Sequence, residues 1–205
     1  GCAYGERGQA GGVGVGGREP CWTAGREQLA ARNGVVLCDM SSFTKFEISG
    51  DLACDLLQYL AVANVDKDVG GAVYTQLCNA RGGIEADVTI IRRARDCCWL
   101  ITGSGLGVRD RDWSERNMRG FLDRRTTAWA SRGEQSVHSG TPASGDLNLR
   151  DITSAYGVIN LAGPYARTVL EKVCDEDVSH AAFAFMSARD IRVGHAPALA
   201  FRVTY

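Results

Sequence analysis

Two acidic side chains, Glu85 and Asp87, lie in the segment 82–90 (GGIEADVTI), which otherwise has the composition of a β-strand. Because side chains alternate along a strand, both carboxylates are expected on one face, about 7 Å apart. The opposite face is predicted to be apolar and to carry Ile84, Ala86, Val88 and Ile90. Carboxylates at about this separation can act together as general acid and base. The polar face of a surface hairpin has the same pattern, and on pattern alone this simpler interpretation is favoured.

The rest of the chain offers weaker patterns for catalysis. Its three histidines, His138, His180 and His195, are expected in a loop, a connection and a strand end, and the chain contains no GxSxG nucleophile motif. The segment 103–107 (GSGLG) follows a predicted strand and precedes a predicted helix, as a phosphate-binding loop does. It lacks the Lys-Ser/Thr pair of such loops and the βαβ context. Surface or structural roles are therefore favoured for these residues.

Eight cysteines are spread along the chain, at positions 2, 21, 38, 54, 78, 97, 98 and 174. A chain of this size and hydrophobic content needs no disulfide framework, so we expect scattered reduced thiols. Cys97 and Cys98 are the only close pair, and adjacent residues on a strand point to opposite faces. With no CxxC or Cys/His spacing, the sequence predicts no metal site.

The composition is that of a globular protein. The 205 residues are 45% hydrophobic, enough for one good-sized core, and the formal net charge is -1. A chain so close to neutral lacks the positive field typical of nucleic-acid and anionic-membrane binders. No apolar run approaches the roughly 20 residues that span a bilayer, and the start of the chain has no hydrophobic signal core. We therefore expect a soluble intracellular protein that binds neither nucleic acid nor membrane.

Hydrophobic periodicity predicts an α+β fold of mixed, largely antiparallel sheets with packed helices. Residues 1–20 are glycine-rich and are expected to form a flexible leader to a domain at 21–205. The aperiodic segment 124–146 is expected to be a loop insertion. Helices are predicted at 23–34, 51–62, 108–122 and 165–174, and strands at 35–40, 43–49, 72–79, 84–93, 97–103, 156–163, 189–195 and 198–205.

Several phrases of the sequence, taken in order, resemble one protein family. They are DMSSFTKFEISG, VYTQLCNARGGIEADVTI, WLITGSG, RDRDW, LRDITSAYGVINLAGPYARTVL and FMSARDIRVG. Together they resemble the folate-binding domain of the aminomethyltransferase family, which includes the glycine cleavage T protein. The SSF-x-KF, TGSG and RD-x-DW phrases look more like the C-terminal halves of dimethylglycine and sarcosine dehydrogenases. The resemblance covers residues 21–205, apart from the predicted loop.

The resemblance implies a function for Asp87 and Tyr74. In the family, an aspartate on the strand after the GG turn lies beside the reactive end of tetrahydrofolate, which makes Asp87 the expected catalytic and cofactor-binding residue. Tyr74 matches a tyrosine that lines the folate pocket in the family. A purely structural role, as a half-buried tyrosine of a strand, is an equally favoured interpretation. Glu85 is expected to stay on the solvated side or to support Asp87. The implied reaction transfers a one-carbon unit from a methylamine-derived iminium, or from an aminomethyl donor, onto tetrahydrofolate.

The sequence also departs from the family. It stops at FRVTY, before a glycine-flanked turn whose glutamate binds the pterin, so we expect a C-terminally truncated domain that is inactive alone. No GxGxxG fingerprint is present, so FAD is expected only in an N-terminal flavin domain of a parent chain. Two alternatives stay open: an inactive truncated fragment, or a non-catalytic module resembling the pyruvate dehydrogenase phosphatase regulatory subunit. The expected compartment is the mitochondrial matrix in a eukaryote and the cytoplasm in a bacterium.

Overall fold

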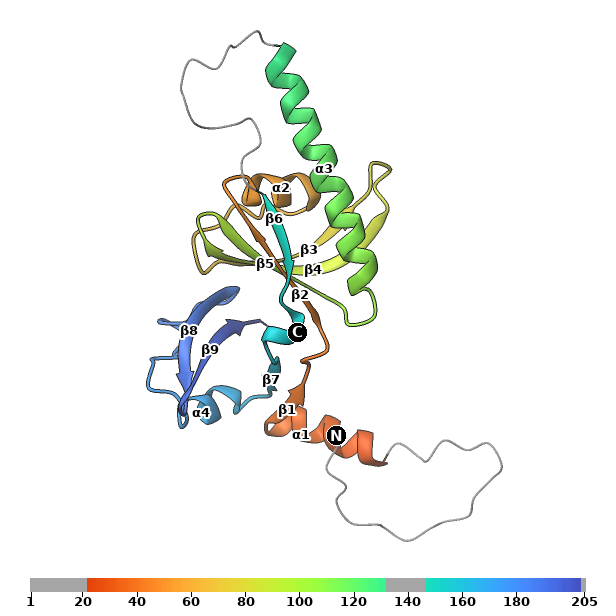
Figure 1. Cartoon of the computed structure of the whole chain (residues 1–205). Coiled ribbons are helices and arrows are strands. Elements are labelled where there is room, and N and C mark those ends of the chain that lie inside the picture. The colour runs from red at the N-terminus through yellow and green to blue at the C-terminus, as the bar shows by residue number, and fades with distance from the viewer. Residues whose placement is uncertain (1–21, 132–146, 204–205) are drawn as a thin grey trace, which may run out of the picture.

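A computed structural model of the chain describes residues 22–131 and 147–203 and has the α+β architecture predicted from the sequence (Figure 1). The predicted leader at 1–20 lies outside the described residues. The helices are α1 (Trp22–Asn33), α2 (Ala53–Leu60), α3 (Gly107–Ser131), the 3-10 turn η1 (Thr153–Ala155) and α4 (Ala166–Leu170). The strands are β1 (Val36–Asp39), β2 (Thr44–Ser49), β3 (Ala72–Cys78), β4 (Ile84–Ala94), β5 (Cys97–Thr102), β6 (Asn148–Asp151), β7 (Ile159–Ala162), β8 (Ser187–Val193) and β9 (Ala196–Arg202).

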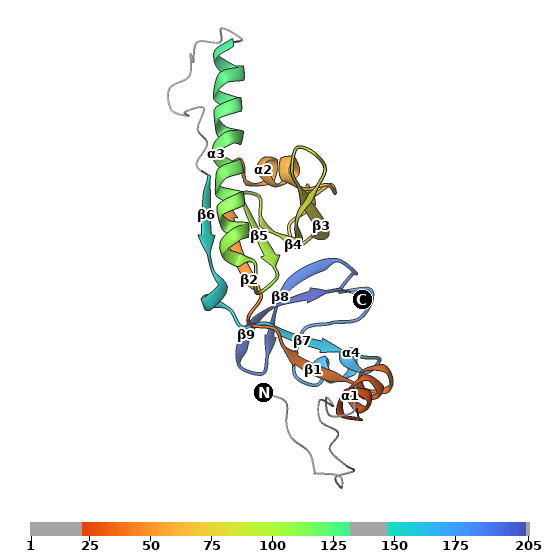
Figure 2. The same cartoon turned by 90° about the vertical axis from the view of Figure 1, so that its right-hand side faces the viewer.

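A five-stranded antiparallel sheet, in the order β3-β4-β5-β2-β6, forms the centre of the molecule. Two antiparallel pairs, β1 with β7 and β8 with β9, make separate two-stranded sheets. Figure 1 shows α2 and α3 above the five-stranded sheet and the β8–β9 hairpin below it, and Figure 2 shows the same order from the side. We call the two sides of the five-stranded sheet the helix face and the hairpin face.

The helix face carries the main hydrophobic core. The pattern of α2 buries Ala53, Leu56, Leu57 and Leu60 on one side of the helix. These side chains meet apolar residues of all five strands, among them Phe46, Val88 and Leu149. Phe121, near the middle of α3, adds to the same core. Burial of these side chains is the main source of stability for this part of the fold.

The hairpin face has a second, smaller core. Ala72, Ile91 and Trp99 of the five-stranded sheet are buried together with Ala188 of β8. The backbone of β8 is also tied to the start of β3, since the Ala188 N–H donates to the carbonyl of Gly70 at 2.6 Å. Gly70 has φ +88°, and a Cβ there would lie 2.9 Å from the carbonyl oxygen of Ala188, so the close approach needs glycine. The β8–β9 hairpin thus covers one end of this face.

Lys45 holds the junction between the five-stranded sheet and the β1–β7 pair. Its side chain is only 2% exposed, and its ammonium group donates to the carbonyls of Ser41 at 3.0 Å and Phe43 at 2.8 Å. Burial lowers the pKa of this ammonium group, and the nearby Asp151 carboxylate opposes the shift. The Lys45 N–H donates to Thr153 Oγ1 at 3.0 Å. Both chain segments that cross between the sheets, after β1 and after β6, are therefore bonded to one residue.

Two sequence predictions of the fold are corrected. The predicted loop at 124–146 begins later, because α3 continues through Ser131; the segment 124–131 contains no glycine or proline to end a helix, and residues 132–146 lie outside the described part. The helix predicted at 165–174 is only five residues long. After Leu170 the backbone tightens into bonds between residues three apart, such as Val173 N to Leu170 O at 3.0 Å.

Truncation of the α2 anchor tests the main core. Leu57 is fully buried, so Leu57→Ala is expected to lower the free energy of unfolding by about 2–5 kcal/mol, measured by urea denaturation. Leu29→Ala makes the same change on α1 at a side chain that is 60% exposed, and it is expected to cost less than about 0.5 kcal/mol. Equal losses from the two variants would contradict this description of the core.

Cys98 of β5 should be far less reactive than the surface thiol of Cys38. Cys98 lies in the core of the helix face, and burial raises the pKa of its thiol to about 12. At pH 8 only about one molecule in ten thousand then carries the reactive thiolate. We expect iodoacetamide, followed by mass spectrometry, to modify the exposed Cys38 in the folded protein and Cys98 only after denaturation. Alkylation of both at similar rates would contradict the buried position.

Candidate functional site

Asp87, Tyr74 and Gln76 form a polar cluster on the hairpin face. Gln76 and Asp87 are direct partners in the β3–β4 ladder, and Tyr74 lies two residues before Gln76 on the same side of β3. The Tyr74 hydroxyl donates to Asp87 Oδ2, and Gln76 Nε2 donates to Asp87 Oδ1 at 3.1 Å. Both oxygens of the carboxylate are thus held by side chains of the neighbouring strand. The two residues predicted from the family resemblance, Tyr74 and Asp87, are brought together.

The cluster lies beyond the part of the hairpin face that β8 and β9 cover. Tyr74 is 57% exposed and Asp87 is exposed, while Ala72, two residues before Tyr74 on the same face, is buried under the hairpin. An ionised carboxylate offers about four acceptor positions, and Tyr74 and Gln76 occupy two of them. Asp87 therefore keeps acceptor capacity toward solvent, beside an accessible aromatic ring.

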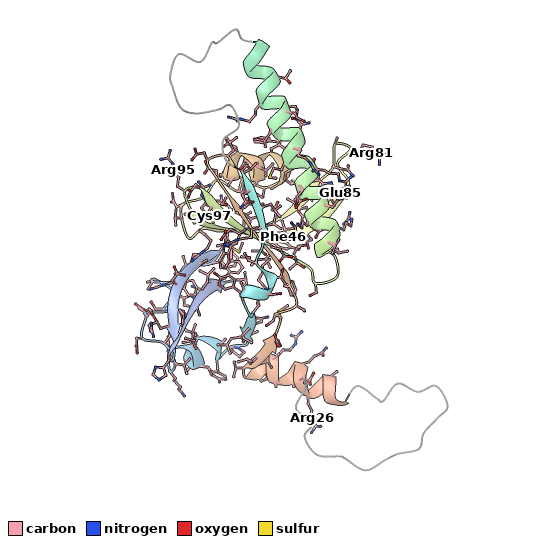
Figure 3. The ribbon with its side chains drawn as sticks, viewed as in Figure 1. Arg26, Phe46, Arg81, Glu85, Arg95 and Cys97 are labelled. Carbon is pink, nitrogen blue, oxygen red and sulfur yellow. The ribbon has the colours of Figure 1, made fainter. Side chains whose placement is uncertain are left out.

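Glu85 belongs to a different network. The β3–β4 register shifts between Leu77 and Cys78 and passes over Glu85, so this residue occupies a β-bulge. Its Oε1 accepts from Asn79 Nδ2 at 2.8 Å, and its Oε2 accepts from Arg109 Nη2 at 2.5 Å. Figure 3 shows Glu85 beside α3, the helix that supplies Arg109. Glu85 and Asp87 thus have separate partners, and Glu85 joins the tip of the β3–β4 hairpin to α3.

The bulge also explains an error in the predicted alternation. Ala86, Val88 and Ile90 are buried on the helix face as predicted, but Ile84 is 68% exposed. Simple alternation places Ile84 with the buried residues, and the extra residue in β4 interrupts that alternation. The apolar face of the strand therefore begins at Ala86.

Comparison with known proteins assigns the fold to a family. The family model described as the GCVT N-terminal domain matches residues 18–205. The chain belongs to this family. Dimethylglycine dehydrogenase, mitochondrial, of Rattus norvegicus is 33% identical over 179 residues, which are 87% of this chain and 18% of the relative. The pyruvate dehydrogenase phosphatase regulatory subunit, mitochondrial, of Mus musculus is 30% identical over 172 residues, covering 83% of this chain and 17% of the relative.

A solved structure supports the same fold. The glycine cleavage system aminomethyltransferase T from Bartonella henselae superposes with a TM-score of 0.59 at 20% identity, covering 80% of this chain and 37% of that chain. The resemblance to the aminomethyltransferase family and the α+β fold class are thereby confirmed. This GCVT N-terminal domain spans about a fifth of the length of the curated relatives that it matches.

The other residues considered from the sequence do not join the Asp87 cluster. The segment 103–107 forms a turn into α3, where Ser104 shares a hydrogen bond with the Ser42 hydroxyl at 2.9 Å. His195 lies in the β8–β9 turn, His138 lies outside the described residues, and His180 contacts two arginines. A hollow of about 430 Å³ lies between the start of β3 and β8, and its lining includes none of the three cluster residues.

Within residues 22–131 and 147–203, no group of three or more His, Cys, Asp or Glu side chains is placed to hold a metal ion. No helix in this described part is long and apolar enough to cross a bilayer.

Sequence reasoning missed Gln76, Asn79 and Arg109. Gln76 could have been found, because it shares a strand face with Tyr74 and lies in a tight hairpin opposite Asp87. Asn79 closes the hairpin turn, where its Oδ1 accepts from the backbone N–H groups of Arg81 and Gly83. Arg109 belongs to α3, and no local sequence pattern indicates that α3 lies against the β3–β4 hairpin. The contact of Arg109 with Glu85 could therefore be found only from the fold.

Replacement of Arg109 tests the link between the tip of the β3–β4 hairpin and α3. Arg109 Nη1 also donates to the Glu85 carbonyl at 2.6 Å, so Arg109→Gln loses bonds to a half-buried partner. We expect the free energy of unfolding to fall by about 1 kcal/mol. Arg116→Gln removes an exposed pair with Asp112 on the same helix and should cost less than about 0.5 kcal/mol. Chemical denaturation of both variants makes the comparison, and equal effects would show that the Glu85 contact contributes nothing.

Proposed function

We propose that this GCVT N-terminal domain binds tetrahydrofolate. We further propose that it forms part of an enzyme that transfers a one-carbon unit from a methylamine-derived iminium to the bound tetrahydrofolate. The observation that carries the proposal is the Asp87 carboxylate, held by Tyr74 and Gln76 on an uncovered part of the sheet. Membership of the family and the similarity to dimethylglycine dehydrogenase support it. Because the chain spans about a fifth of that relative, any oxidative step would belong to other parts of a longer protein.

The residues present fit a flat, polar heterocycle. Tyr74 offers an exposed aromatic ring on which such a ring system can stack. Asp87, which accepts a hydrogen bond from the Tyr74 hydroxyl, offers further acceptor positions beside that ring. These positions suit the N–H groups of a pterin. Gln76 fixes the second carboxylate oxygen, which limits the rotation of the Asp87 side chain. The cluster thus supplies stacking and charge-assisted hydrogen bonding side by side.

Asp87 has three tasks in the proposed reaction. When bound, tetrahydrofolate supplies the nucleophilic nitrogen that receives the one-carbon unit. The Asp87 carboxylate orients the ligand through hydrogen bonds, stabilises positive charge that develops nearby, and can accept the proton released by the nitrogen. The Tyr74 hydroxyl and Gln76 amide hold the carboxylate in place before the ligand arrives, so little reorganisation is needed.

A non-catalytic regulatory role is the second candidate. The observation in its favour is the similarity to a pyruvate dehydrogenase phosphatase regulatory subunit, which at 30% identity is nearly as similar as the dehydrogenase. A pure binding surface does not require a carboxylate fixed at both oxygens on an open strand face, and for this reason we place the folate function first. Both relatives are mitochondrial by name, so in a eukaryote we propose the mitochondrial matrix as the compartment.

Calorimetric titration with reduced tetrahydrofolate, under anaerobic conditions, tests the proposal. The wild-type chain is expected to give saturable binding, and Asp87→Asn is expected to raise Kd about 10- to 100-fold, because a charge-assisted hydrogen bond is lost. The matched control is Asp51→Asn, which makes the same substitution at an exposed turn residue and should leave Kd unchanged. Circular dichroism of all three proteins checks that each is folded.

The outcomes separate the candidates. Absence of saturable heat from a folded wild-type chain would contradict folate binding by this chain and would favour the two alternatives, a regulatory module or an inactive fragment. Equal Kd values for wild type and Asp87→Asn would show that folate binds without this carboxylate, and would remove Asp87 from the site.

A further inference from the structure

A second polar cluster lies away from Asp87, between α4 and the end of β9. Arg167 of α4 and Arg202 of β9 both point their guanidinium groups at the ring of His180, which belongs to the connection before β8. Arg167 Nη2 is 2.8 Å from Nε2 and 3.1 Å from Nδ1 of the ring, and Arg202 Nη2 contacts Nδ1. Neither arginine is fully exposed.

The cluster has more donors than acceptors. A guanidinium group carries five N–H donors and no acceptor, and a neutral imidazole accepts at only one of its two nitrogens. His180 therefore cannot satisfy both arginines. The one other acceptor bonded to either guanidinium, among residues 22–131 and 147–203, is the carbonyl of Phe183, which receives Arg202 Nη1. Most N–H groups of the two arginines thus have no protein acceptor in this part of the chain.

No carboxylate of the described residues balances the two charges. Neither Arg167 nor Arg202 has an acidic group within ion-pair distance there, although an acidic run, Asp175 to Asp177, is close in sequence. Within that run, Glu176 Oε1 accepts from the Arg192 N–H at 3.0 Å, and Asp177 Oδ1 accepts from the Ser179 N–H at 2.8 Å. Burial and then the two arginines lower the pKa of His180, as expected for an imidazole facing positive charge alone.

We propose that Arg167, His180 and Arg202 form a binding site for an oxyanion, a carboxylate or phosphate group of a small-molecule ligand. The planar guanidinium fork matches both groups and binds them through two parallel N–H···O bonds. An oxyanion between the arginines supplies the missing acceptors and relieves the repulsion between the two cations. Water can supply acceptors but not the opposing charge. The inference does not rest on the tetrahydrofolate proposal, because it uses none of the residues of that site.

Titrations with inorganic phosphate and with glutarate, a dicarboxylate, test the site on the full chain. Binding is followed by calorimetry and by the NMR signal of the His180 ring, assigned with a His180→Gln variant. Sodium chloride at matched ionic strength separates specific binding from screening. We expect saturable binding of at least one of the two anions, with a shift of the His180 signal that chloride does not reproduce. Phosphate alone identifies a phosphate ligand, glutarate alone a carboxylate ligand, and both together a general oxyanion site.

Arg167→Gln is the decisive variant, because the only partner of the Arg167 guanidinium in the described residues is His180. Its removal therefore leaves the Phe183 contact of Arg202 intact. It is expected to weaken binding of the anion about tenfold. Arg119→Gln removes the same charge from an exposed position on α3, across the five-stranded sheet, and should leave binding unchanged. An effect of phosphate and glutarate equal to that of chloride, or wild-type affinity in Arg167→Gln, would overturn the proposal.

Discussion

The alternation of side chains along β4 is the constraint on which the rest of the structure depends. Ala86, Val88 and Ile90 fill the core beneath α2 and α3, and this burial fixes the register of the strand. Asp87 must then lie on the opposite face, directly across from Gln76. A slip of one residue would bury the carboxylate and expose the core, at a cost far larger than any gain at the site. The residues that fill the core therefore also fix the position of the candidate site.

The local parts of the site could be predicted from the sequence. Period-two alternation separates Asp87 from its apolar neighbours, and the glycine pair before it indicates a hairpin with a partner strand that carries Tyr74. The family resemblance, and no physical pattern, singled out Asp87 over Glu85. The structure gives an independent reason for the difference, because the bulge turns Glu85 into a structural link with Arg109. A bulge of one residue leaves no clear sign in the sequence, so the exposure of Ile84 was also missed.

The fold was predictable to the level of elements but not of their partners. Most helices and strands follow their periodicity, and the α+β class follows from their order. Sequence patterns could not indicate that β2 lies between β5 and β6, or that β1 leaves the main sheet to pair with β7. These pairings depend on burial of surfaces from distant segments. Lys45 shows the same limit, since a lysine in a strand predicts a solvated side chain, and the structure buries it among main-chain carbonyls.

The order of the strands has a consequence for synthesis on the ribosome. β1 and β2 are made before β6 and β7, yet within the described residues β1 pairs only with β7, and β2 completes its ladder only when β6 has been made. Until then the nascent chain carries unpaired strand edges, which are sites for association with other chains. Pairings so distant in sequence also slow folding, because a long loop must close before the contact forms. A chaperone that shields the segment from β1 to β2 during translation would therefore cover the strand edges that wait longest for their partners.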